Sequence, residues 1–312
     1  MNYTLSTVTF KSHDGRSDLF GRIYAPASGV VRGVVQLSHG MVDHVGRYED
    51  LASYLTARGY VLAGNDHLGH GGSVSCDDDF GFFADRGGVD LLLRDLHAMN
   101  RILREKFPGI KPVIMGHSLG SFLSRLYANK YPHTVSGHII HGTGGPMGII
   151  LPLGKALVKF ITLFRGKRYR SPFVKSVAFA GYNSKFPKEE GNNAWLTRDI
   201  ARVSDRDTDK RTSFTFTLSA YYDLFCAVGR SNSKKWFAEY PQELPTLIMS
   251  GDMDPVGAYG EGPKYVYKHL LVRGVADLKL KMYDGARHEL FNESNREDVF
   301  ADIAAWLGGI FK

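Results

Sequence analysis

The chain contains very little cysteine: Cys76 and Cys226 are the two cysteines among its 312 residues. Small extracellular proteins commonly depend on several disulfide bonds, so this count argues against such a framework and favours a reducing compartment. Residues Met1–Ser6 lack a charged start followed by an apolar run, so we expect no signal peptide. Together these absences predict a cytoplasmic protein with two inert thiols.

The sequence also lacks a long uninterrupted apolar run. Its most apolar stretch, Pro146–Phe164, is broken by Lys155 and Lys159, so it does not read as a membrane-spanning helix. The formal net charge is +7, but the positive residues are scattered apart from one basic run, Arg165–Arg170. No nucleic-acid-binding motif accompanies this charge, so nucleic acid is not an expected partner and an anionic lipid surface fits better.

Metal-ligand spacing is missing as well. Histidine, cysteine and acidic residues do not recur at the short intervals typical of a metal site, and no cofactor-binding motif is present. We therefore expect neither a metal nor a cofactor. No sequence feature indicates an oligomeric state.

What the sequence does contain is an alternation of short apolar runs with longer helical patterns. Such alternation predicts an α/β fold, a mostly parallel sheet with helices on both faces. The helices are expected at 48–58, 91–106, 118–130 and 298–311. The eight expected strands are 7–11, 19–24, 33–38, 60–63, 111–115, 135–141, 246–250 and 277–282, the first two forming a hairpin.

One region lacks this alternation of strands and helices. Between Pro146 and Pro245 the sequence indicates helices and loops but no convincing core strand. We therefore divide the chain into a core of residues 1–145 and 246–312 and a helical cap, residues 146–245, inserted between two sheet strands.

A serine nucleophile is indicated by Gly116–Gly120, which fits the pattern G-x-S-x-G around Ser118. In a nucleophile elbow the serine occupies a strained strand-to-helix turn, and the flanking glycines relieve crowding there. The pattern alone is weak, and an ordinary strand-to-helix turn is the alternative. The expected strand before it and helix after it favour the elbow.

A serine nucleophile requires a base and a group that orients the base. His288 follows the last expected strand, and Asp254 follows the preceding one, so both lie at carboxyl ends of strands, where open α/β sheets place their sites. Asp252 is a rival for the acidic role. We favour Asp254 because it lies further beyond the strand. The oxyanion that forms during the reaction needs backbone donors, for which we expect the N–H groups of Leu119 and Met41.

These motifs resemble the monoacylglycerol lipase and lysophospholipase branch of the α/β-hydrolases, also described as serine aminopeptidase-like. The resemblance implies the α/β-hydrolase fold, favours Asp254 over Asp252, and makes Asp66, His70, His44 and Arg47 structural braces. Ser121 and Gly72 depart from the usual family pattern, in which a glycine and a polar residue are expected. The motifs are His39–Tyr48, Asp66–Ser73, Gly116–Gly120, Gly251–Val256 and Gly285–Glu289.

The cap contains an amphipathic helical pattern in which Leu153, Leu157, Phe160, Ile161 and Phe164 share one face. This face either packs on the core or touches a lipid surface, aided by the basic run. In the resembling family the cap lines the acyl pocket. The residues that we expect to bind substrate are Leu153, Leu157, Phe160, Trp195 and Tyr222, with Phe214, Phe216, Tyr221 and Phe225 as further aromatic candidates.

The sequence thus predicts a serine carboxylic-ester hydrolase that acts through an acyl-enzyme, on monoacylglycerols or lysophospholipids, and that contacts a membrane peripherally through the cap. A small-ester esterase is an alternative. So is a peptidase or amidase, for which Glu189 and Glu190 would have to hold a substrate amine. A non-catalytic binding protein is disfavoured because no triad residue is missing.

Overall fold

A computed structural model describes residues 3–312. It contains one eight-stranded sheet with the strand order β1-β2-β4-β3-β5-β6-β7-β8. The strands are β1 (Tyr3–Lys11), β2 (Asp18–Pro26), β3 (Gly33–Ser38), β4 (Tyr60–Asn65), β5 (Val113–His117), β6 (Gly137–His141), β7 (Thr246–Gly251) and β8 (Leu278–Tyr283). β1 and β2 pair antiparallel to each other, β2 pairs antiparallel to β4, and all other pairs are parallel.

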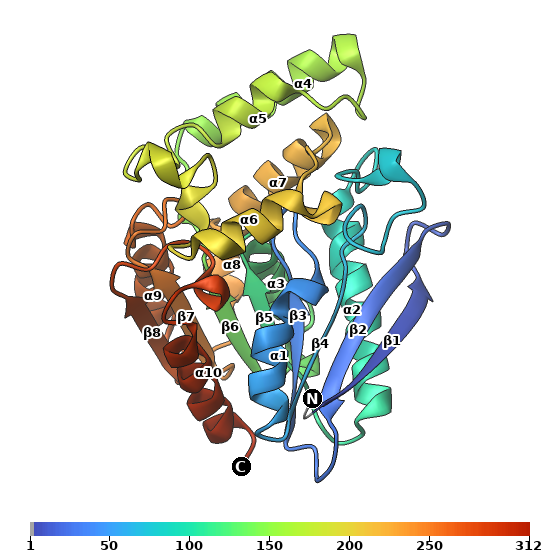
Figure 1. The fold of residues 1–312 in the computed structure, drawn as a ribbon, viewed down its shortest axis with the longest axis vertical. Coiled ribbons are helices and arrows are strands. Elements are labelled where there is room, and N and C mark those ends of the chain that lie inside the picture. The colour runs from blue at the N-terminus through green and yellow to red at the C-terminus, as the bar shows by residue number, and fades with distance from the viewer. Residues whose placement is uncertain (1–2) are drawn as a thin grey trace.

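Helices cover both faces of this sheet (Figure 1). On one face lie α1 (Glu49–Thr56) and α10 (Arg296–Ile310), and on the other lie α2 (Gly88–Lys106), α3 (Leu119–Lys130) and α9 (Glu261–Arg273). Strands β3 to β7 are buried along their whole length, which is why they read as apolar runs without alternation. The predicted fold, including the eight-stranded and mostly parallel sheet, is confirmed.

The segment between β6 and β7 contains no strand and holds five α-helices: α4 (Ile150–Arg165), α5 (Pro172–Ala178), α6 (Ile200–Thr208), α7 (Leu218–Ser231) and α8 (Lys234–Glu239). Figure 1 shows α4 and α5 furthest from the sheet, with α6 and α7 between them and the core. The last helix, α8, packs on α3 and α9 and so joins the helical layer of the core. Within residues 3–312 no helix is long and apolar enough to span a membrane.

The orientation of α4 corrects one sequence-based expectation. Of the two alternatives for its apolar stripe, packing on the core is the one that the structure contradicts: Leu153 and Phe160 are each 61% exposed and Phe164 is 73% exposed. The helix instead turns a second apolar stripe toward α7, where Leu151 approaches Gly229, Gly154 approaches Phe225, and Val158 is buried. Because α4 is apolar on both sides, its sequence pattern does not reveal which side is buried.

Candidate active site

Ser118 lies at the turn between β5 and α3, with backbone angles φ 52° and ψ −118°. A non-glycine residue rarely adopts a positive φ, and such strain is typical of a nucleophile elbow. The two glycines of the motif are required sterically: a Cβ on Gly116 would lie 2.3 Å from the Gly120 carbonyl, and one on Gly120 would lie 1.8 Å from that of Ser38. The strain at Ser118 therefore depends on close backbone packing that only glycine permits.

Ser121, which departs from the family pattern, fits this turn without disturbing it. Its side chain is buried, and its hydroxyl donates a 2.6 Å hydrogen bond to the Ser118 carbonyl. Gly72, the second departure, is explained by crowding, because a Cβ there would lie 2.9 Å from the Phe20 ring.

His288 and Asp254 meet at the carboxyl ends of the strands. The Nδ1 of His288 lies 2.9 Å from the Oδ2 of Asp254, and both side chains are almost completely buried. Asp254 Oδ1 accepts a 2.8 Å hydrogen bond from the Val256 N–H, which fixes the carboxylate. Asp252 makes no contact of this kind with His288, and its buried Oδ1 has no hydrogen-bond partner within residues 3–312. Of the two rival carboxylates, the structure brings Asp254 to the histidine.

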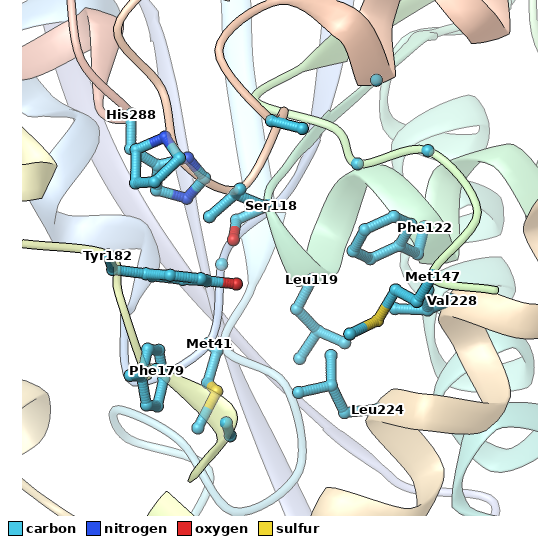
Figure 2. Close-up of a pocket in the computed structure, with 18 of the residues that line it drawn as sticks. Met41, Ser118, Leu119, Phe122, Met147, Phe179, Tyr182, Leu224, Val228 and His288 are labelled. Carbon is cyan, nitrogen blue, oxygen red and sulfur yellow. The ribbon is translucent and has the colours of Figure 1, made fainter. Parts of the chain in front are cut away.

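Ser118 and His288 line the same pocket (Figure 2). No direct hydrogen bond joins their side chains within the described chain, and such bonds commonly tighten only when substrate is bound. The arrangement presents a hydroxyl, an imidazole and a carboxylate in the order that a Ser-His-Asp system requires.

Backbone donors for an oxyanion are also present. Leu119 is the first residue of α3, where the helix leaves its N–H groups without partners. In the opposite loop, the Gly40 N–H donates to Asp43 and the Val42 N–H donates to His70. No hydrogen bond from the intervening Met41 N–H occurs within residues 3–312, so this donor is without a partner there.

A buried ionic network holds the Met41 loop. Arg47 contacts Asp43 at 3.0 Å and Glu289 at 2.7 Å, and the Tyr48 hydroxyl donates to Asp43 at 2.7 Å. Burial would raise the pKa of Glu289, but Arg47 outweighs it and lowers this pKa to about 2. The pKa of Asp43 is likewise held well below its ordinary value, against the effect of burial, chiefly by Arg47. Both carboxylates are therefore charged and paired at neutral pH.

The motif Asp66–Ser73 also braces the surrounding loops. Asp66 accepts 2.8 Å hydrogen bonds from the N–H groups of Val45 and Gly72, and His44 contacts Asp209 of the cap at 3.2 Å. His117, beside Ser118, stacks on His141 and lies 4.7 Å from His288 between ring centroids. Burial and the neighbouring histidines keep its pKa well below the usual value, so this ring is neutral and packs rather than titrates.

The pocket above Ser118 has a volume of about 740 Å³. That size suits a single ligand rather than a macromolecule. Figure 2 shows Ser118 and His288 beside apolar side chains. The apolar residues that line it include Met41, Leu119, Phe122, Met147, Ile150, Phe179, Trp195, Leu224, Phe225 and Val228.

Of the five residues predicted to bind substrate, the structure brings only Trp195 to this pocket. Leu153, Leu157 and Phe160 do not reach it because their side of α4 faces away from α7, and Tyr222 lies under Lys159 instead. Phe225 is a lining residue, whereas Phe216 and Tyr221 are fully buried, Phe216 against His70 and Phe83 of the core. Phe179 and Tyr182 were missed, since they lie in an irregular segment after α5 with no periodic pattern.

The helical segment between β6 and β7 is attached directly to the loop that carries His288. The Glu289 N–H donates to the Leu196 carbonyl at 2.7 Å, and the Arg287 guanidinium donates to the Ala194 carbonyl at 2.6 Å. Arg287 also pairs with Glu190 at 2.5 Å. Glu190 is thus engaged by Arg287 and lies outside the pocket lining, so it is not placed to hold a substrate amine.

The basic run is also partly occupied. Arg168 pairs with Asp79 at 3.2 Å, and Arg170 donates to the carbonyls of Asp78 and Phe80. These arginines fasten the cap to the loop before α2 rather than projecting freely. Among residues 3–312 no group of three or more His, Cys, Asp or Glu side chains is arranged to hold a metal ion.

Comparison with known proteins shows the family to which the chain belongs. Residues 29–295 match the family described as Serine aminopeptidase, S33. The chain belongs to this family. It is 32% identical to monoglyceride lipase of Rattus norvegicus, over 93% of this chain and 86% of that one. It is 26% identical to monoacylglycerol lipase of Mycolicibacterium smegmatis, over 88% of each chain.

One solved structure is similar to this protein over almost the whole length of both chains. The carboxyl esterase from Bacillus coagulans, crystallised in complex with glycerol, superimposes with a TM-score of 0.91 at 28% identity and covers 99% of both chains. The predicted superfamily, the lipase-like family and the assignment of the chain as a hydrolase enzyme are therefore confirmed.

Proposed function

We propose that this enzyme hydrolyses carboxylic esters through an acyl-enzyme. Ser118 attacks the carbonyl carbon, and His288 accepts the serine proton and then delivers it to the leaving alcohol. Asp254 holds the imidazole in the required tautomer and stabilises its positive charge. The N–H groups of Met41 and Leu119 bind the oxyanion, and water then releases the acyl group.

The substrate class follows from the pocket. A largely apolar pocket of about 740 Å³ adjoins Ser118, and its lining includes Phe122, Met147, Leu224 and Val228. Each buried methylene of a substrate contributes roughly 0.8 kcal/mol, so such a lining selects for an acyl chain. We assign single-chain lipid esters as substrates, with monoacylglycerols first and lysophospholipids second, in agreement with the monoglyceride lipases to which the chain is similar.

A small-ester esterase remains the second candidate, favoured by the similarity to the Bacillus coagulans carboxyl esterase. A peptidase function is disfavoured, because Glu190 pairs with Arg287 and neither Glu189 nor Glu190, the pair expected to hold a substrate amine, lines the pocket.

We further propose that residues 146–245 form the cap of the active site. We also propose that the enzyme is cytoplasmic and that the cap contacts the membrane surface without crossing it. The outer surface of α4 and α5, here called the outer apolar patch, carries large side chains that are about half exposed or more. Patches of this kind mark contact with proteins or membranes. The residues are Ile149, Ile150, Leu153, Phe160, Leu163, Phe164, Phe173 and Val177.

The experiment that tests the function compares the enzyme with Ser118→Ala on monoacylglycerols, lysophospholipids, p-nitrophenyl esters and an aminoacyl anilide. We expect ester turnover that rises with acyl length, no anilide turnover, and no activity in the variant. A fluorophosphonate probe should label the enzyme and not Ser118→Ala. Turnover of acetate esters alone would support the small-ester alternative, and activity that survives in Ser118→Ala would exclude this nucleophile.

A further inference from the structure

Tyr182 brings a hydroxyl group from the cap into a pocket that is otherwise largely apolar. The residue lies in the irregular segment after α5 and lines the pocket together with Ser118, Met41 and His288. Figure 2 shows its ring extending across the cavity with the hydroxyl directed toward Ser118. No hydrogen bond from this hydroxyl to another side chain or to the backbone occurs within residues 3–312.

The ring of Tyr182 is held in place by aromatic neighbours. It meets Trp195 edge-on with 5.1 Å between centroids, and Phe179 in the same manner at 5.5 Å. Trp195 in turn lies 5.1 Å from the His288 ring. The phenol is therefore positioned relative to the histidine through a continuous chain of ring contacts, which is the rigidity that a preorganised donor needs.

The backbone around Tyr182 is fixed as well. The side chain of Asn183 accepts a 3.0 Å hydrogen bond from the Trp195 N–H and donates one of 2.7 Å to the Gly191 carbonyl. The Trp195 carbonyl accepts a hydrogen bond from the His288 N–H at 3.4 Å. Tyr182 thus belongs to the part of the cap that is bonded to the His288 loop, whereas α4 and α5 lie further out.

Tyr182 is half-buried and lines the pocket, so its hydroxyl can donate a hydrogen bond to an acceptor that a substrate brings there. Burial, assisted by the negative charge of Asp254, raises the pKa of Tyr182 to about 12. The group is therefore a neutral hydrogen-bond donor throughout the physiological pH range. The acceptor that appears beside Ser118 during the reaction is the oxygen of the attacked carbonyl, which gains a full negative charge when the bond to Ser118 forms.

We propose that the hydroxyl of Tyr182 is a third donor to this oxyanion, in addition to the N–H groups of Met41 and Leu119. The inference rests on the proposed ester hydrolysis at Ser118. As the Ser118 oxygen bonds to the carbonyl carbon, the carbonyl π electrons move to oxygen and the serine proton passes to His288. Tyr182 keeps its own proton and donates only a hydrogen bond. The oxyanion site is then complete only when the cap segment that carries Tyr182 is in place.

The test is Tyr182→Phe, which removes the hydroxyl and keeps the ring contacts with Trp195 and Phe179. We expect kcat to fall about 10- to 100-fold, toward the lower end of the loss seen when one oxyanion donor is removed elsewhere. KM should change by less than about threefold, because the interaction is made in the transition state. Tyr169→Phe is the matched control: Tyr169 is also a half-buried tyrosine of the cap but does not line the pocket.

Substrate and inhibitor series separate this role from the alternatives. The loss should be the same for monoacylglycerols and for p-nitrophenyl esters, whose leaving group has no free hydroxyl. The affinity for an alkyl trifluoromethyl ketone, which forms an oxyanion on Ser118, should fall by the same factor as kcat/KM. A loss restricted to monoacylglycerols would mean that Tyr182 binds the glycerol group, and an unchanged kcat would mean that it is only an aromatic wall. Either result overturns the proposal, whereas the Ser118→Ala comparison reports on the proposed function independently.

Discussion

The indole of Trp195 lies 5.1 Å from the imidazole of His288, with the two ring planes inclined by 37°. Trp195 belongs to the cap and His288 to the core, and hydrogen bonds of the adjoining backbone accompany this contact. Arg198 adds a 2.8 Å ion pair with the buried Glu293 close by. The inner part of the proposed cap therefore forms one wall of the pocket that holds Ser118 and His288, and the proposed lipid contact lies on its outer part.

The first prediction concerns the carboxylate that orients His288. Asp254→Asn should lower kcat by several orders of magnitude, ~10⁴ in a well-studied protease triad, because the amide stabilises the wrong histidine tautomer. Asp252→Asn should cost far less, since Asp252 does not reach His288. Steady-state kinetics on a p-nitrophenyl ester measures both, with circular dichroism as the check on folding. An equal loss in the two variants would remove the reason for choosing Asp254.

The geometry of the candidate site could be predicted from sequence where the site lies in short segments at strand ends: the structure brings Asp254 to His288 and places Ser118 in the same pocket. Ser118, Asp254, His288 and the Met41 loop are examples, because strained turns and loops after buried strands leave local signatures. The strand boundaries were less accurate: β5 was expected to begin at 111 and begins at Val113. Such shifts are ordinary, since strand ends depend on pairing with neighbours.

The lining of the pocket could not be predicted in the same way. Helix α4 is apolar on two sides, so hydrophobic periodicity favoured the stripe with Leu153 and Phe160, which faces outward. Tyr182 had no local signal at all, because its position depends on hydrogen bonds between Asn183 and residues 191 and 195. Tertiary contacts of this kind are not encoded in a repeating pattern.

The second prediction concerns stability and pH. Folding lowers the pKa of Glu289 from 4.5 to about 2, so its contribution is fully present above pH 4.5 and is lost as the pH falls toward 2. Glu289→Gln should therefore reduce the free energy of unfolding at pH 7 by on the order of 3 kcal/mol, and the difference should shrink between pH 4.5 and 3. Urea unfolding of the unmodified protein and the variant at pH 7 and at pH 3 measures this difference.

The control for this prediction is Glu239→Gln, which removes one partner of an exposed ion pair with Lys235. Its effect should stay within about 0.5 kcal/mol at either pH. A Glu289→Gln difference that is the same at pH 7 and pH 3 would show that the loss is one of packing rather than of charge.

The third prediction concerns the outer apolar patch. Phe160 and Phe164 contact each other edge-on on the outside of α4, with 5.2 Å between ring centroids. Burying one such ring is worth about 1.5–3 kcal/mol, so replacing both by serine should weaken binding to phosphatidylglycerol-containing vesicles more than tenfold. Hydrolysis of a soluble p-nitrophenyl butyrate should be unaffected. Ile200→Ser, at an exposed position on α6, is the matched control. Unchanged co-sedimentation with vesicles in the double variant would show that the patch is not the membrane contact.

The last prediction concerns acyl-chain length. Leu224 projects from α7 into the pocket near Leu119, Met147 and Val228, as Figure 2 shows. In the unmodified enzyme kcat/KM should rise about fourfold for each added methylene until the pocket is filled. Leu224→Trp occupies part of that volume, so the rise should stop at a shorter chain while acetate esters, which do not extend that far, are turned over as before.

Two variants at other positions make this prediction specific to the pocket. Leu271→Trp adds the same side chain at an exposed position on α9 and should leave the length profile unchanged. Leu157→Ser should also leave it unchanged, because Leu157 does not line the pocket, although the sequence pattern alone had suggested the opposite. A p-nitrophenyl ester series from acetate to palmitate gives the profile for each variant. If Leu224→Trp slows all chain lengths equally, the acyl group does not lie along α7. The apolar cavity would then have to receive another part of the substrate.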